Sequence, residues 1–161
     1  MRVEPRGAYP FRSSKSLRHM GILKHTVFTP EGEYTLVGEC VFTDVDGLAL
    51  NGAHRRYALH FETDWVPSDG FWSVTMYDGN SMSLVDNELH RHALHSSMHD
   101  ALEREPSGAL TVWLQKESPG ETREANWLPT PAGPFYMVFR VFLPVPEYLS
   151  PEWIPPTVRR R

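Results

Sequence analysis

The sequence predicts a mainly β fold: a jelly-roll-like antiparallel β-sandwich with one short helix. Short runs in which apolar and polar residues alternate recur along the chain, as in strands that bury one face. Turn-forming residues separate these runs, and 14 prolines among 161 residues disfavour long helices. One run, residues 135–143, is apolar on both faces and would lie at the centre of such a sandwich.

This central run carries the strongest strand signal and one anomaly. Aromatic and β-branched residues dominate it and a proline bounds it on each side, which favours a strand over a buried helix. Arg140 stands in its middle, where a guanidinium group needs acceptors because burying an unpaired charge is costly. Two interpretations remain open. Arg140 forms a structural ion pair, for instance with Asp78 or Asp86, or it lines a pocket and binds an anionic ligand.

Five other runs are predicted to be strands because their composition or alternation fits a half-buried sheet. They are residues 22–29, 34–43, 56–62, 71–77 and 109–115. The run 56–62 alternates most clearly, with Tyr57, Leu59 and Phe61 on one face.

The segment 44–47, Asp-Val-Asp-Gly, follows the second of these runs. It matches the first residues of a calcium loop, but residue 55 is arginine where such a loop would close with glutamate. We therefore predict a tight turn in which Gly47 takes a positive φ angle.

Residues 88–104 are the predicted short helix, and they hold the residues with the clearest metal-binding chemistry. On that helix three histidines would share a face with Glu88. They are His92, His95 and His99. Imidazoles at such spacing can bind zinc, copper or nickel, and the other interpretation is a polar face that is rich in histidine. No cofactor is expected, and these histidines are the candidates if a metal binds.

Composition narrows the function classes. The formal net charge of −4 gives no sign of a nucleic-acid surface, and the arginines 159–161 are interpreted as a solvated terminus. Cys40 is the only cysteine, which excludes an intrachain disulfide and a cysteine-based zinc site. The sequence has no 18-residue apolar segment, so no membrane span is expected.

The chain divides into two predicted parts. Residues 1–20 are expected to be an irregular N-terminal arm. This arm is basic but lacks the apolar stretch of a signal peptide, which makes a cytoplasmic location the default. Residues 21–161 are predicted to form a single β-sandwich domain, because this length suits one core.

Five stretches stand in an order that resembles one known family. They are 71–78 (Phe-Trp-Ser-Val-Thr-Met-Tyr-Asp), 85–87 (Val-Asp-Asn), 110–115 (Leu-Thr-Val-Trp-Leu-Gln), 126–135 (Asn-Trp-Leu-Pro-Thr-Pro-Ala-Gly-Pro-Phe) and 153–156 (Trp-Ile-Pro-Pro). Together they resemble the Domain of Unknown Function 1214 family, over about residues 30–158. The resemblance implies a jelly-roll-like sandwich, which in many relatives is the C-terminal half of a longer chain, after a Domain of Unknown Function 1254.

The resemblance implies no reaction, because the family has no settled activity. Arg91 matches an arginine of the family. The chain departs from the family pattern directly afterwards: the family continues with tyrosine and then Gly-Asp-Arg, where this chain has His92 and His95. The histidines are therefore a feature of this chain rather than of the family.

Two functions from different classes fit these observations. The first is a non-catalytic binding or assembly module, which would take a small molecule or carbohydrate, or self-associate as a homo-oligomer. Its candidate ligand-binding residues are Arg140, Arg91, Trp127 and Tyr77. The second is a metal-dependent enzyme of unknown substrate that uses the histidines and a buried arginine. We favour the first, because no nucleophile, base and orienting group can be assembled from the sequence.

Overall fold

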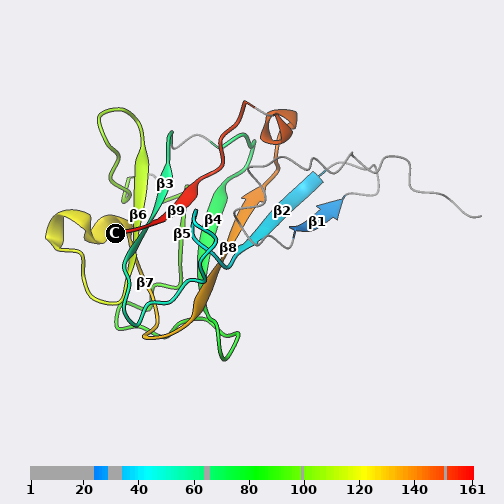
Figure 1. Ribbon diagram of the computed structural model, residues 1–161. Coiled ribbons are helices and arrows are strands. Elements are labelled where there is room, and N and C mark those ends of the chain that lie inside the picture. Colours follow the sequence, from blue (N-terminus) through cyan, green and yellow to red (C-terminus); the bar gives the residue numbers. More distant parts are fainter. Residues whose placement is uncertain (1–23, 29–33, 64–65, 99, 151) are drawn as a thin grey trace, which may run out of the picture.

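The computed structural model describes residues 24–28, 34–63, 66–98, 100–150 and 152–161. These residues form strands and two short 3-10 helices (Figure 1). The strands are β1 (Lys24–Phe28), β2 (Tyr34–Val41), β3 (Tyr57–Phe61), β4 (Trp72–Asp78), β5 (Ala93–His95), β6 (Leu110–Gln115), β7 (Trp127–Pro129), β8 (Phe135–Phe142) and β9 (Thr157–Arg160). The helices are η2 (Glu121–Asn126) and η3 (Pro146–Leu149).

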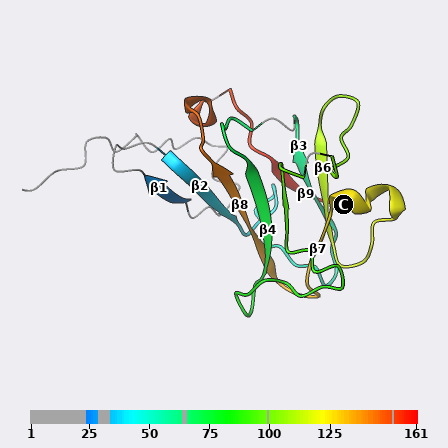
Figure 2. The same ribbon diagram turned by 180° about the vertical axis from the view of Figure 1, so that it is seen from behind.

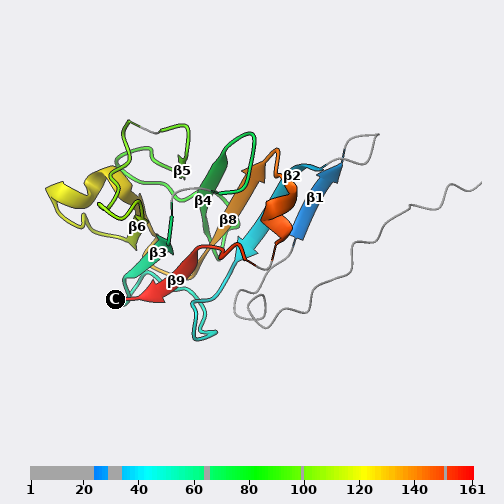
Figure 3. The ribbon, with the colours of Figure 1, turned by 90° about the horizontal axis from the view of Figure 1, so that it is seen from above.

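The strands form two sheets that enclose one core. The first sheet has five strands in the order β1-β2-β8-β4-β5, and the second has four in the order β7-β6-β3-β9. All neighbours are antiparallel except β6 and β7. Figure 3 shows β9 beside β3, far along the chain from it. The predicted mainly β sandwich is confirmed, and the jelly-roll connection of its strands stays a prediction.

Strand β8 is the centre of the five-stranded sheet, as its sequence predicts. It lies between β2 and β4 in both Figure 1 and Figure 2. Met137, Phe139 and Val141 point inward and are at most 4% exposed. They meet side chains of the opposite sheet, among them Leu59 and Val112. Burying each such side chain stabilises the fold by about 1.5–3 kcal/mol.

A polar pair is buried within this apolar core. Glu39 on β2 is 3% exposed, and Tyr148 of η3 donates a hydrogen bond of 3.0 Å to its Oε1. The Tyr148 ring packs on Trp153 with their centres 4.5 Å apart. Burial, and then the negative charge of Glu39, raise the pKa of Tyr148 far above its ordinary value. The tyrosine is therefore a permanent hydrogen-bond donor to the carboxyl group at neutral pH.

The helix predicted for residues 88–104 is wrong. Residues Ala93–His95 form β5, which pairs with β4, and turns make up most of the remaining described segment. The Asn87 side chain accepts from the amide of Arg91 at 3.0 Å and donates to its carbonyl at 2.9 Å, so it replaces helical backbone bonds. His90 has a φ angle of 50°, outside the right-handed helical region.

Some predictions fall on residues outside those described. The arm at residues 1–20 and His99 lie there. The turn at 44–47 is described and is confirmed, with Gly47 at a φ angle of 77°. Neither of the two described helices has the length or the apolar character that a membrane crossing requires.

Candidate binding surface on the five-stranded sheet

The side of the five-stranded sheet that faces away from the core carries the predicted residues Arg140 and Tyr77. Strand register places them, because residues paired across antiparallel strands point to the same side. On β8 the outward residues alternate with those that face the core, and their neighbours on β2 and β4 share the outward side. We call the following group the Arg140 surface: Cys40, Thr75, Tyr77, Tyr136 and Arg140.

Aromatic rings border Arg140 on both sides along β8. Tyr136 stacks on Tyr77, with ring centres 5.1 Å apart and planes 11° apart, and it also stacks on Phe42 at 5.1 Å. Beyond the other side of Arg140, Phe142 stacks on Phe71 at 4.3 Å. The stacking covers these rings on the sheet, so Tyr136 is only 8% exposed although it faces outward.

The Arg140 guanidinium makes its hydrogen bonds to neutral hydroxyl groups. Its Nη1 donates to Thr75 Oγ1 at 3.3 Å and its Nη2 donates to the Tyr77 hydroxyl at 3.4 Å. Both distances are long for such bonds. Within the described residues no carboxylate lies at ion-pair distance from it. An arginine has five N–H donors, so this cation retains capacity for an acceptor.

The carboxylate suggested as its partner is engaged elsewhere. Asp78 Oδ1 accepts hydrogen bonds from the amides of Asn80 and Ser81, both at 2.8 Å, in the turn after β4. These bonds hold the pKa of Asp78 below its ordinary value, because they stabilise the charged form. Asp86, the other suggested partner, is exposed on a segment that follows that turn. The structural ion pair expected for Arg140 is thus not formed with the described residues.

The charge of Arg140 acts on its neighbours. Burial raises the pKa of the Cys40 thiol, and the nearby guanidinium lowers it by a smaller amount. Burial likewise raises the pKa of Tyr136, and Tyr77 and Cys40 raise it by smaller amounts. The charge of Arg140 lowers it. At neutral pH the thiol and the phenol therefore keep their protons. The surface offers hydrogen-bond donors, one cation and ring edges, which suits binding of an anion.

Arg91 and Trp127 lie together, but in another place. Arg91 Nη1 donates to the carbonyls of Glu124 and Trp127, at 2.6 and 2.9 Å, and so holds the end of η2 and the start of β7. The Trp127 indole donates to the Gln115 carbonyl at 2.8 Å. The four candidate residues thus form two pairs, Arg140 with Tyr77 and Arg91 with Trp127, rather than one site.

The described histidines do not gather. His92 Nδ1 contacts the carbonyl O of Val85 at 2.9 Å, while His95 sits on β5 opposite Ser73. No group of three His, Cys, Asp or Glu side chains that could hold a metal ion occurs within the described residues. The histidines lie apart because residues 93–95 form strand β5, so the helical face that they would share does not exist.

Sequence reasoning missed three members of the Arg140 surface: Cys40, Thr75 and Tyr136. Each stands on a predicted strand, and Tyr136 is four residues before Arg140 and therefore on the same face. That spacing is a usable signal within one strand. The contributions of β2 and β4 depend on the register between strands, which a single sequence does not supply.

The fold defines the class of the protein as a mainly β sandwich domain. The family model of the protein of unknown function DUF1214 matches residues 37–146, and the chain belongs to that family. This confirms the resemblance seen in the sequence. None of the curated proteins matches the chain.

Two solved structures are similar in fold. One is the VPA0106 protein of Vibrio parahaemolyticus, with a TM-score of 0.66 and 25% sequence identity over 79% of this chain. The other is an uncharacterized protein from Burkholderia cenocepacia, with a TM-score of 0.51 and 19% identity over 78% of this chain. The matches span only 31% and 29% of those two longer chains. These similarities support the sandwich fold and do not indicate an activity.

Proposed function

We propose that this chain is a non-catalytic binding module whose ligand is a small organic carboxylate held at the Arg140 surface. The observation that carries the proposal is the Arg140 guanidinium, which stands in the middle of a sheet face and has, among the described residues, only the hydroxyls of Thr75 and Tyr77 as acceptors. The planar fork of an arginine matches a carboxylate with two parallel hydrogen bonds.

The energetics favour an anionic ligand. Arg140 is partly shielded from water by its neighbours, so part of its hydration is lost on folding. Hydrogen bonds to charged groups contribute about 1.5–3 kcal/mol, roughly twice those between neutral groups. A carboxylate that replaces the two long bonds to hydroxyls would therefore make a stronger contact with Arg140, and this contact would favour binding of the ligand.

The ring stacks supply a second contact for the ligand. Tyr77 on one side and Phe71 and Phe142 on the other provide apolar ring surface beside the cation, while Tyr136 supports Tyr77 from a buried position. Ligand sites combine such apolar surface with a few polar groups that fix orientation. A molecule with a ring, either aromatic or a sugar, next to its carboxylate fits this arrangement.

Binding is tested with matched pairs of acids and neutral analogues, such as benzoate with benzamide and glucuronate with glucose. We expect at least one acid to raise the melting temperature, and its neutral analogue to have no effect. Arg140→Met should weaken binding of that acid tenfold or more, because 1.4 kcal/mol corresponds to a factor of ten. Tyr77→Phe should weaken it less, and Arg55→Gln, which is exposed and is not part of the Arg140 surface, should leave it unchanged.

Cys40 provides an independent readout at the same surface. As the only cysteine, it is the single site of thiol alkylation. An acid that pairs with Arg140 removes the charge that lowers the Cys40 pKa, and it also covers the thiol, so alkylation by iodoacetamide should slow. The proposal is wrong if no acid in the panel binds or slows alkylation, or if Arg140→Met binds the acids as well as the parent chain does.

Self-association is the other expectation for this class of module. A second copy seated on the Arg140 surface would raise the hydrodynamic mass and protect Cys40 at high protein concentration without any added acid. Sedimentation at two concentrations, combined with the alkylation rate, separates this outcome from ligand binding. If protection of Cys40 from alkylation depends on protein concentration alone, the surface serves self-association rather than binding of a small ligand.

A further inference from the structure

A basic pocket lies where the segment after β2 meets β9. It is an open depression of about 570 Å³, within the size range of ligand sites. Its lining residues are Val45, Asp46, His54, Arg55, Arg159, Arg160 and Arg161. We call it the Arg159 pocket. It shares no residue with the Arg140 surface.

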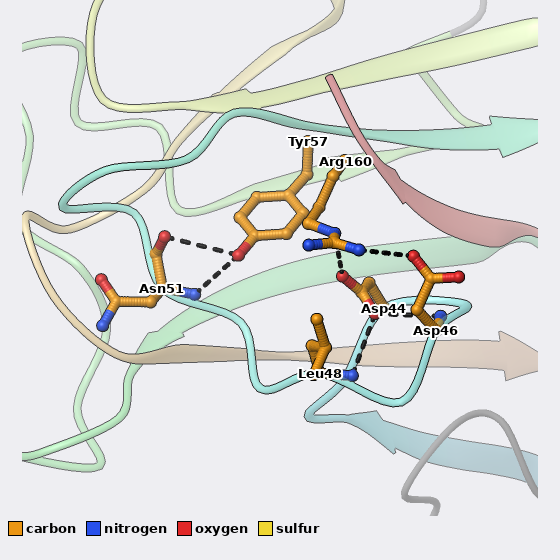
Figure 4. A network of polar contacts seen from close by, with 6 residues as sticks. All are labelled: Asp44, Asp46, Leu48, Asn51, Tyr57 and Arg160. Carbon is orange, nitrogen blue, oxygen red and sulfur yellow. Dashed lines mark hydrogen bonds and ion pairs between the residues drawn. The ribbon is translucent and has the colours of Figure 1, made fainter.

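A polar network holds two of the residues that line this pocket, Asp46 and Arg160 (Figure 4). Asp44 is 1% exposed, and its Oδ1 accepts hydrogen bonds from the amides of Asp46 and Leu48, both at 3.0 Å. The other oxygen of Asp44 pairs with Arg160 Nε at 2.9 Å, while Asp46 pairs with Arg160 Nη2 at 2.6 Å. The turn after β2 is thereby tied to β9, so the pocket is built into the fold.

The neighbouring arginines point to the other side of β9. Arg159 pairs with Ala58, which in turn pairs with Trp113, so these three residues share the outward side of the four-stranded sheet. The Arg161 guanidinium lies 4.3 Å from the centre of the Trp113 ring. A cation over an indole ring is favourable and limits the freedom of the side chain. Arg161 is therefore partly positioned before any ligand arrives.

Charge is unbalanced in the pocket. Asp44 and Asp46 are both committed to Arg160. Within the described residues, Arg55, Arg159 and Arg161 have no ion-pair partner. Three uncompensated guanidinium groups thus line one depression, in a chain whose formal net charge is −4. A field of this sign attracts anions to one place on an otherwise acidic protein.

We infer that the Arg159 pocket binds a ligand with two or more phosphate groups. Three arginines from two chain segments can each bind a different pair of phosphate oxygens. A ligand with a single carboxylate has too few oxygens to pair with all three arginines. The Nη1 of Arg160 makes no hydrogen bond to its two aspartates and adds a further donor. Free oligophosphates and clustered phospholipid headgroups present this same chemistry.

Tripolyphosphate is the probe for the free ligand, measured by isothermal titration calorimetry at low salt. We expect binding that weakens as salt is added, because contacts between arginine and phosphate are screened. The double variant Arg55→Gln/Arg159→Gln should weaken it tenfold or more. Both side chains are exposed and outside the core, so the variant should keep the melting temperature of the parent chain. Arg140→Met is the control and should bind tripolyphosphate as the parent chain does.

Vesicles distinguish the two sources of phosphate. Binding to vesicles rich in phosphatidylinositol bisphosphate, absent with phosphatidylcholine vesicles and lost in the double variant, would identify headgroups as the source. Tripolyphosphate binding without vesicle binding would identify a free ligand. The inference is overturned if neither probe binds at low salt, or if the double variant binds both as tightly as the parent chain. Because the control variant separates the two surfaces, failure here leaves the Arg140 proposal standing.

Discussion

Glu39 and Arg140 are neighbours on the same sheet, on opposite sides, and their surroundings differ. Glu39 faces the core and accepts a hydrogen bond from Tyr148, so its burial is compensated. Arg140 faces outward and has, within the part of the chain that the structure describes, two long bonds to hydroxyls and no carboxylate partner. A buried compensated group is expected to stabilise the fold, whereas a cation with no counter-charge in that part of the chain is expected to serve binding.

Tyr148→Phe tests the buried pair. Removing the hydroxyl takes a donor from a buried carboxyl group, so the free energy of unfolding should fall by about 1–3 kcal/mol at pH 7. Urea unfolding followed by tryptophan fluorescence measures this. A variant as stable as the parent chain would show that the hydrogen bond contributes nothing net.

The same variant has a predicted dependence on pH. The folded-state pKa of Tyr148 is raised above the ordinary value near 10, so the unfolded chain loses this proton at a lower pH than the folded chain does. The stability linked to this group is complete below pH 10 and is lost as the pH rises above it. Tyr148→Phe lacks this loss, so its deficit relative to the parent chain should shrink between pH 9 and pH 11. A constant deficit would contradict the raised pKa.

At the scale of elements, the short strand β5 depends on the turn before it. The Asn87 side chain donates to the carbonyls of Val85 and Arg91, at 3.2 and 2.9 Å, and accepts from the Arg91 amide. Asn87→Ala should therefore lower the free energy of unfolding by about 1–2 kcal/mol, since partly buried backbone groups would lose their partners.

Asn80→Ala is the matched control for this turn. Asn80 is exposed, and its side chain makes no hydrogen bond with the described residues. The control should change stability by less than about 0.5 kcal/mol. Equal effects of the two substitutions would show that β5 does not rely on the Asn87 bonds.

The long strands could be predicted from the sequence, and the short ones could not. β2, β3, β4, β6 and β8 begin and end within two residues of the predicted runs, because alternation persists long enough to show a face. β9 contains one buried residue, Val158, between polar ones, so nothing local marks it as a strand. Its pairing with β3 supplies what its own composition lacks.

The candidate site residues also divide into some that the sequence could predict and some that it could not. Arg140 could be selected because a charge interrupts an apolar run, and Tyr77 proved to be its hydrogen-bond partner. Arg91 and Trp127, the other two candidates, lie apart from this surface, where the Arg91 guanidinium donates to the Trp127 carbonyl. From the sequence alone the arginines of β9 resemble a solvated terminus, because the pocket depends on a turn more than a hundred residues earlier in the chain.

At the scale of the whole molecule, the two sheets share one core and should unfold together. We expect a single transition in which circular dichroism and tryptophan fluorescence coincide, with equal calorimetric and van't Hoff enthalpies. A chain that lacks residues 1–20 should retain this transition, because residues 21–161 are predicted to be the whole domain. Two separated transitions, or loss of folding on truncation, would contradict that boundary.

The position of β9 has a consequence for solubility. β9 is an edge strand of its sheet, and an exposed edge offers backbone groups to which a strand of another molecule can add. Here the Val45 amide already donates to the Val158 carbonyl on that edge. Arg160 is held by Asp44 and Asp46, whereas Arg159 has no ion-pair partner among the described residues. A second copy that extended the sheet through its own β9 would bring a second Arg159 close to this one, and we expect repulsion between like charges to disfavour that contact. A cation that we assign to phosphate recognition is therefore also expected to oppose growth of the sheet into a fibre.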